Sequence, residues 1–375
     1  MDHKKIISGY KKQGARIETA ARVKLRTKAD IAFWYTPGVG VASSYLAQHP
    51  KEARQMSVKK NSVAVVSDGS AVLGLGNIGP YGALPVMEGK ALLFKQMANI
   101  DAWPIVLDTQ DADEIVRVVK AIAPAFGGIN LEDISAPKCF AVEAALSGLG
   151  IPVMHDDQHG TAIVVLAGLI NAAKVAKKTL SKLTVVISGA GAAGVAVAKL
   201  LSAAGVKDIV LLDRTGIISP ARQDLTPIKQ ELLAFTNPRK LAGGLDEAMR
   251  DADAFVGVSG KGALKAEHVE LMAENAIVFA LANPEPEIFP EEAKAAGALV
   301  VATGRSDFPN QINNALVFPG VFRGALDRGV TTITEASKLR AAKALAALVP
   351  KPTAAKIIPD VLDKRVVSAV AKAIR

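Results

Sequence analysis

The sequence has little cysteine, few aromatic residues and no long apolar run. Its 375 residues include one cysteine, Cys139, so no disulfide can form within the chain, and a reducing compartment suits it. No apolar run reaches the roughly 18 residues that a membrane helix needs. The start of the chain, MDHKKIISGYKK, lacks the apolar centre of a signal peptide. These absences predict a soluble, cytoplasmic protein without membrane contact.

The net charge of +9 does not indicate a nucleic-acid partner. Residues 1–30 carry nine Lys and Arg against three acids, and residues 335–375 carry the same numbers, so the basic excess lies at the two ends. The first basic stretch has no interleaved aromatics and matches no nucleic-acid module. We interpret the charges as solvated helix faces, the alternative being contacts with anionic ligands or a partner subunit.

Apolar strand-like segments alternate with helix-length segments along the whole chain, which predicts an α/β fold of two domains on largely parallel sheets. The first domain, residues 1–158, contains candidate strands at 62–68, 103–108, 128–134 and 151–156. The second, residues 159–375, has candidates at 183–189, 208–213, 253–260, 276–284 and 298–304. A long apolar helix from Thr161 leads into the second domain, and a basic, alanine-rich helical tail ends the chain.

The second domain carries the pattern of a dinucleotide-binding turn. VVISGAGAAG places Gly189, Gly191 and Gly194 after a strand and at a helix start, the setting in which G-x-G-x-x-G is informative. Glycines allow the turn and the close approach of a pyrophosphate, which the helix N-terminus favours. We expect Ala192 and Ala193, between the glycines, to contact the cofactor as well. An incidental glycine-rich turn is the alternative.

The next strand ends at Asp213, 24 residues after Gly189, where an acid binds the adenosine ribose 2′-hydroxyl. This position favours NAD over NADP, because a carboxylate repels a 2′-phosphate. Arg214, the following residue, could instead pair with that phosphate, so the sequence leaves the cofactor preference open.

The segment IPVMHDDQHGTA, residues 151–162, has two histidines four residues apart, as in the H-E-x-x-H helix of zinc proteases. Gly160 and the strand-like IPVMH predict instead that His155 and His159 lie in a turn before a helix that begins at Thr161. That placement argues against a zinc-protease site.

The acids of the first domain predict a different metal site. Asp156 and Asp157 end one candidate strand, and Glu132 and Asp133 end the preceding one. Two acidic pairs at neighbouring strand ends repel each other unless a cation lies between them. Oxygen ligands suit Mg²⁺ or Mn²⁺. Capping and turn acids are the alternative.

Other polar residues stand at positions that chemistry could use. Tyr35 precedes a Pro-Gly turn, and Lys90 begins an apolar stretch, GKALLF, where partial burial would lower its pKa toward that of a useful base. Asn283 ends a candidate strand, and Asn313 and Asn314 follow in a polar loop. The alternatives are an interfacial tyrosine, a solvent-reaching lysine and ordinary loop asparagines.

Taken together, these segments are more specific than any one of them. In order and spacing, the chain resembles the short bacterial and archaeal malic enzymes over roughly residues 15 to 350, through the motifs YTPGVG, SDGSAVLGLGNIGPYGALPVMEGKALLFK, NLEDISAPKCFAVE, HDDQHGTA, GAGAAG and TGRSDFPNQINNALVFPGVFRGALD. The resemblance implies oxidative decarboxylation of (S)-malate to pyruvate and CO2, with NAD or NADP and Mg²⁺ or Mn²⁺.

The resemblance also implies roles for single residues. Tyr35 matches the general acid of the family and Lys90 its general base. Glu132, Asp133 and Asp157 match the metal ligands, with Asp156 as a further carboxylate near Lys90 or the metal. The three asparagines, Asn283, Asn313 and Asn314, match contacts to the substrate and the nicotinamide side of the cofactor.

One position departs from the longer members of the family. They carry an arginine that clamps a malate carboxylate, where this chain has Ala71; how the C4 carboxylate is held is therefore open. A malolactic enzyme, which releases lactate, is the alternative activity, and no motif separates the two. Family members are dimers or higher oligomers, which predicts a homodimer or larger homo-oligomer.

Overall fold

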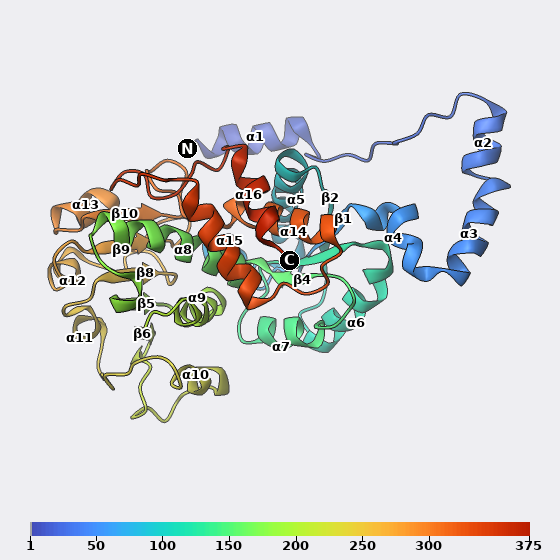
Figure 1. The fold of residues 1–375 in the computed structure, drawn as a ribbon. Coiled ribbons are helices and arrows are strands. Elements are labelled where there is room, and N and C mark those ends of the chain that lie inside the picture. Colours follow the sequence, from blue (N-terminus) through green and yellow to red (C-terminus); the bar gives the residue numbers. More distant parts are fainter. Residues whose placement is uncertain (1) are drawn as a thin grey trace.

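Two parallel sheets form the body of the protein, which we describe from a computed structural model covering residues 2–375 (Figure 1). The first sheet has the order β2-β1-β3-β4 and is parallel throughout. Its strands are β1 (Ser62–Ser67), β2 (Asp101–Val106), β3 (Gly128–Leu131) and β4 (Val153–His155). The helices connecting them are α5 (Gly79–Ala98), α6 (Ala112–Ile122) and α7 (Lys138–Ala145).

The second sheet has the order β10-β9-β8-β5-β6-β7, which is the strand order of a doubly wound dinucleotide-binding fold. Its strands are β5 (Thr184–Ser188), β6 (Asp208–Asp213), β7 (Gly216–Ile217), β8 (Ala254–Gly257), β9 (Ile277–Ala280) and β10 (Val300–Thr303). Every pair is parallel except β6 with β7. The sequence did not predict β7, because two residues are too few to show a strand pattern.

The helices of the second half are α8 (Asp156–Val175), α9 (Ala192–Ala203), α10 (Pro227–Leu232), α11 (Leu245–Met249), α12 (Ala266–Glu270), α13 (Pro290–Ala295), α14 (Phe318–Arg328), α15 (Glu335–Ala347) and α16 (Arg365–Ala373). The two-sheet α/β architecture predicted from the sequence is confirmed. The division of the chain at residue 158 stays a proposal, since α8 runs directly out of β4.

The predicted start of the long apolar helix at Thr161 is wrong, because α8 begins at Asp156. Gly160 is accommodated inside the helix, where a side chain would collide with the Asp156 carboxylate. His155 is the N-cap residue and His159 lies in the first turns, so the two histidines do not form a helical pair.

The chain's last helices return to the first sheet. Phe94 of α5 packs against Phe318 and Phe322 of α14, with ring centroids 4.7 and 5.5 Å apart. These residues belong to one buried core that also includes strands β5 and β9 of the second sheet. Packing of α14 on α5 therefore ties the end of the chain to the first sheet.

The N-terminal region is the exception to this packing. Helix α1 (His3–Gln13) lies along the body, and an extended stretch then leads to α2 (Lys28–Trp34) and α3 (Gly38–Gln48), which stand away from both sheets (Figure 1). Helix α4 (Ala53–Met56) brings the chain back to β1. Among residues 2–375, no helix combines the length and apolar character needed to cross a bilayer.

The contact between α5 and α14 can be tested by truncating Phe94, which is fully buried. We expect Phe94→Ala to lower the free energy of unfolding by about 3–5 kcal/mol, because it leaves a cavity between the two helices. Urea denaturation followed by circular dichroism measures the change. Phe289→Ala is the matched control, because Phe289 is 42% exposed; equal losses in the two variants would contradict this packing.

Candidate active site

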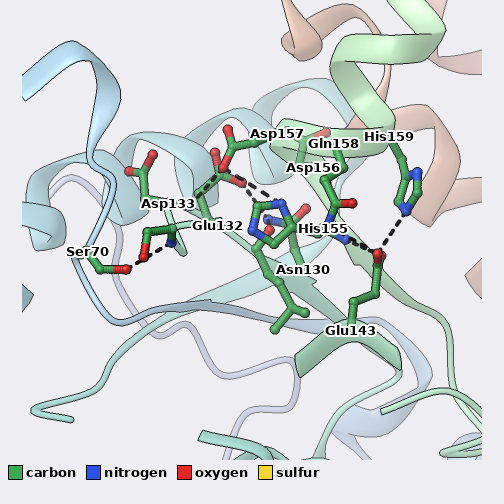
Figure 2. Close-up of polar contacts among 12 residues, drawn as sticks. Ser70, Asn130, Glu132, Asp133, Glu143, His155, Asp156, Asp157, Gln158 and His159 are labelled. Carbon is green, nitrogen blue, oxygen red and sulfur yellow. Dashed lines mark hydrogen bonds and ion pairs between the residues drawn. The ribbon is translucent and has the colours of Figure 1, made fainter. Parts of the chain in front are cut away.

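The carboxyl ends of β3 and β4 bring four acidic residues together. Leu131 and His155 are partners in the parallel register, so the residues that follow them leave the sheet at the same edge. Glu132 and Asp133 come after β3, and Asp156 and Asp157 open helix α8 (Figure 2). The sequence-based expectation that the two acidic pairs are neighbours is confirmed.

Three of these acids form a cluster suited to a metal ion. Ligand oxygens of Glu132, Asp133 and Asp157 all lie within 4.8 Å of one another. The Asp133 backbone amide donates to Asp157 Oδ2 at 2.9 Å, which fixes the two loops together. Asp133 Oδ2 is buried without a hydrogen-bond partner. Such an oxygen-only set with an unsatisfied carboxylate oxygen fits Mg²⁺ or Mn²⁺.

The pKa values of the acids in this cluster also indicate a cation site. Burial and the neighbouring carboxylate of Asp157 raise the pKa of Asp133 to about 7. Burial is also the main cause that raises the pKa of Glu132 well above its usual range, and Asp157 adds to it. Burial and the neighbouring carboxylate both disfavour the charged forms of these acids, and a bound cation would stabilise those forms.

Lys90 lies beside the same acids. It is buried on α5 and its Nζ is bonded to a Glu132 oxygen and, at 2.6 Å, to Asp156 Oδ2. The ammonium also faces the Phe318 ring, 4.6 Å from its centroid. Burial lowers the pKa of Lys90, but the carboxylates of Asp156, Glu132 and Asp157 outweigh it and raise the pKa. The predicted lowering of this pKa is therefore wrong for the chain as described, because these carboxylates stabilise the ammonium.

Asp156 accepts from Lys90 and is itself fully buried. Burial raises its pKa to about 6, against the opposing effect of Lys90. Its second oxygen, Oδ1, has no hydrogen-bond partner within the described chain. The prediction that Asp156 lies near Lys90 is confirmed by this geometry.

A cavity of about 600 Å³ joins this cluster to the second sheet. Lys90, Glu132, Asp133 and Asp157 line it from the first half of the chain, and Ala192, Ala193, Asn283, Asn313 and Asn314 line it from the second half. Ala71 also lines the cavity, so this position offers a methyl group and no charge to a bound substrate. The structure thus brings together most of the residues singled out from the sequence.

The glycine-rich turn has the form that a pyrophosphate site requires. Gly189 has φ +114° and directly follows β5, and α9 begins at Ala192 with Gly191 as its N-cap. A side chain at Gly194 would collide with the Gly189 carbonyl oxygen. No side chain caps the start of α9, and Ala192 and Ala193 line the cavity, so this helix N-terminus suits a dinucleotide phosphate.

Asp213 ends β6, as predicted, but its carboxylate is already paired with two basic side chains. Arg222 binds it through two nitrogens at 2.7 and 3.0 Å, and Lys229 binds it at 2.6 Å. Despite the opposing effect of burial, these bonds hold the pKa of Asp213 well below its usual range. Arg214 is exposed. Sequence reasoning missed Arg222 and Lys229, because they lie in a loop and a short helix without a recognisable motif.

Tyr35 is not brought to this cavity within one chain. It ends α2, is 67% exposed and stands on the segment that projects from the body (Figure 1). Two residues that the sequence analysis did not select, Tyr10 and Arg16, line the cavity instead. Arg16 is paired with Glu88 at 3.1 Å and donates to the Tyr10 hydroxyl at 3.0 Å.

A second missed group supports the turn that carries Asp156 and Asp157. Glu143 accepts from the His155 backbone amide at 2.9 Å and is bonded to His159 Nε2 at 3.0 Å (Figure 2). Lys338 of α15 lies 2.9 Å from the other ring nitrogen of His159. His159 therefore supports the start of α8 through its ring and His155 through its backbone amide, and neither histidine belongs to the metal cluster. No spacing rule in the sequence links Glu143 to residues 12 and more positions away.

Comparison with known proteins gives the family. Residues 14–147 match the family "Malic enzyme, N-terminal domain" and residues 158–375 match "Malic enzyme, NAD binding domain". The chain is 54% identical to the NAD-dependent malic enzyme of Geobacillus stearothermophilus, over 96% of this chain and 76% of that protein. It is 51% identical to the bifunctional malic/malolactic enzyme of Bacillus subtilis, over 97% of this chain and 90% of that protein.

Solved structures agree with the sequence relatives. The crystal structure of the NAD-dependent malic enzyme from Thermotoga maritima matches with a TM-score of 0.95 at 46% identity, covering 100% of this chain and 98% of that one. That of the malic enzyme from Pyrococcus horikoshii matches with a TM-score of 0.91 at 50% identity, covering 96% and 85%. With two family matches that together span most of its length, this chain belongs to the malic enzyme family.

Proposed function

We propose that this protein catalyses the oxidative decarboxylation of (S)-malate to pyruvate and CO2, with reduction of NAD and with a divalent metal ion. The observation that carries the proposal is one cavity that holds a buried lysine, a three-carboxylate cluster and the start of helix α9 behind a dinucleotide-type turn. A proton acceptor, a cation site and a hydride acceptor are what oxidation of a 2-hydroxy acid with loss of CO2 requires.

Each group then has a role on the substrate. A cation bound by Glu132 and Asp157 would offset their negative charge and lower the pKa of Lys90, so that its neutral amine can accept the C2 hydroxyl proton when C2 is oxidised. Asp156 holds this amine in position. Glu132, Asp133 and Asp157 would hold Mg²⁺ or Mn²⁺, which would supply Lewis-acid stabilisation of negative charge on the substrate. Asn283, Asn313 and Asn314 contact the substrate and the nicotinamide ribose from the opposite wall.

The malolactic reaction is the second candidate. The 51% identical relative from Bacillus subtilis is named as a bifunctional malic/malolactic enzyme. Both reactions begin with the same oxidation and decarboxylation, and they differ in whether pyruvate leaves or is reduced to lactate. A cavity that retains NADH beside pyruvate would favour lactate, so both products have to be measured.

Two further features belong to the proposal. We take the protein to act as a homodimer or larger homo-oligomer. A cytoplasmic location suits a chain whose single cysteine, Cys139, is buried and unpaired.

The role of Lys90 can be tested by substitution. We expect Lys90→Ala to reduce malate-dependent formation of NADH by about 10²–10⁴-fold, since the C2 hydroxyl then has no base. Absorbance at 340 nm with malate, Mn²⁺ and NAD, with pyruvate and lactate assayed at the end point, measures it. Lys95→Ala, on the same helix but half exposed, is the control. A Lys90→Ala enzyme with wild-type turnover would contradict the assignment.

The cofactor preference depends on Asp213. We expect Asp213→Ser to raise the NADP/NAD ratio of kcat/KM by about 10–100-fold, because the carboxylate no longer binds the ribose hydroxyl and Arg222 and Lys229 become free for a 2′-phosphate. Steady-state kinetics with both cofactors measures the ratio. Asp224→Ser provides a control, because Asp224 also pairs with Arg222 but is half exposed. An unchanged ratio in Asp213→Ser would show that the ribose 2′ position is read elsewhere.

A further inference from the structure

The metal cluster and Lys90 account for one end of malate and leave the other end without a partner. The C1 carboxylate and the C2 oxygen form a chelating pair, which suits a divalent ion held by Glu132, Asp133 and Asp157. The C4 carboxylate is separated from C2 by C3, so it needs a partner of its own, because a carboxylate taken out of water without one weakens binding. Ala71 offers it only a methyl group.

Two cationic side chains line the cavity within residues 2–375, those of Lys90 and Arg16. Lys90 is already bonded to Glu132 and Asp156, and it is the base at C2 in the proposed reaction. The three asparagines of the lining are neutral. Arg16 is therefore the remaining full positive charge that a second carboxylate of the substrate can meet in this cavity.

Arg16 is held in place by α5, the helix that also carries Lys90. Its Nε and Nη2 atoms donate to one oxygen of Glu88, Oε2, at 3.2 and 3.1 Å, and Nη2 donates to the Pro85 carbonyl oxygen at 2.7 Å. The Arg16 side chain is 18% exposed. Three hydrogen bonds thus anchor one edge of the guanidinium to α5 and fix the direction in which the other end points.

The other end of the guanidinium, Nη1, stands beside the cavity wall. A Cβ at Gly89 would lie 3.8 Å from Nη1, and Gly89 lines the cavity directly before Lys90 in the chain. Nη1 carries two N–H groups, and one of them donates to the Tyr10 hydroxyl. The other N–H has no hydrogen-bond partner among the described residues, so it is available to a ligand in the cavity.

Tyr10 places a second donor next to this N–H. Its hydroxyl oxygen accepts from Nη1 at 3.0 Å, and its ring faces the guanidinium, with Arg16 Cζ 4.6 Å from the ring centroid. Within the described chain the phenol proton is not donated to any residue, and Tyr10 also lines the cavity. One N–H and one O–H therefore lie side by side, an arrangement that the two oxygens of a carboxylate can accept together.

We propose that Arg16 and Tyr10 bind the C4 carboxylate of the substrate, so that this pair makes the protein specific for 2-hydroxy acids with a second carboxylate. The inference rests on the proposed function, since it names specificity residues of the same site. The C4 carboxylate is charged while C2 is oxidised and leaves as uncharged CO2. Arg16 therefore contributes to substrate binding and not to the loss of CO2, and its removal affects KM more than kcat.

Ligands with and without the distal carboxylate test the role of Arg16. We expect Arg16→Gln to raise KM for (S)-malate by about 10–100-fold, which is the effect of losing a charge-assisted hydrogen bond, with kcat close to the wild-type value. Formation of NADH with Mn²⁺ and NAD measures both constants. Oxalate has the two adjacent oxygens that chelate a metal ion but no distal carboxylate, so its inhibition constant against malate is expected to stay unchanged in Arg16→Gln.

A purely structural role of Arg16 predicts a different result. Arg16 ties the N-terminal segment to α5 through Glu88 and Pro85. If loss of that tie displaced Lys90, kcat would fall and the affinities for malate and oxalate would weaken together. That outcome would overturn the proposal, and so would an unchanged KM for malate in Arg16→Gln.

Two further variants accompany Arg16→Gln. Tyr10→Phe keeps the ring and removes the hydroxyl donor, so we expect KM for malate to rise by about 2–10-fold with the oxalate constant unchanged. Arg22→Gln is the matched control, because Arg22 belongs to the same N-terminal segment but is 69% exposed and pairs with Asp101. It is expected to leave both constants at their wild-type values, and an equal rise of KM for malate in Arg22→Gln and Arg16→Gln would overturn the proposal.

The wild-type protein separates this inference from the proposed function. If it reduces NAD with malate, the proposed function stands and the variants decide the role of Arg16. If it does not, the proposed function fails, and calorimetric titration of the Mn²⁺-loaded protein with malate and with oxalate still tests the carboxylate site. In that titration Arg16→Gln is expected to weaken malate binding alone. Equal malate binding by the two proteins, or no malate binding by the wild type, would overturn the assignment of Arg16.

Discussion

Repulsion among carboxylates that leave two neighbouring parallel strands is the constraint on which the rest of this structure depends. Glu132, Asp133 and Asp156 are buried, and Asp157 stands at the first turn of α8 beside them. The parallel register of β3 and β4 places these residues at the same edge of the sheet. Two cations can compensate them: the ammonium of Lys90, which is present, and a divalent ion that the three clustered acids would hold.

Much of the surrounding structure serves to hold this arrangement in place. Glu143 binds the turn between β4 and α8 through the His155 amide and the His159 ring, and Lys338 extends the contact to α15. Asn130 donates to Glu132 at 3.0 Å. On the side of the second sheet, the cavity is lined by Ala192, Ala193, Asn283, Asn313 and Asn314. One charged cluster is thus supported from both sheets, so that loss of a support changes the geometry of the metal ligands and the base together.

Elements with a strong local pattern could be predicted from the sequence. The strands other than β7, the G-x-G-x-x-G turn and the two acidic pairs follow from apolar runs and from the residues directly after them. The start of α8 was misplaced because Gly160 has the local signature of a turn, while the need to fit beside Asp156 is a tertiary contact. Arg222 and Lys229 could not be foreseen for the same reason: their pairing with Asp213 joins segments that no local rule connects. The direction of the Lys90 pKa required knowing how many carboxylates surround it.

The claim that Glu132, Asp133 and Asp157 form a divalent cation site is tested most directly by Mn²⁺ binding to the full chain without malate or cofactor. Electron paramagnetic resonance of free Mn²⁺ during a titration gives the number of sites and the affinity. We expect one site per chain, with affinity for Mn²⁺ reduced by about 100-fold in Asp157→Asn and unchanged in Asp113→Asn, whose carboxylate is exposed on α6. Wild-type affinity in Asp157→Asn, or no Mn²⁺ binding by the wild-type protein, would contradict it.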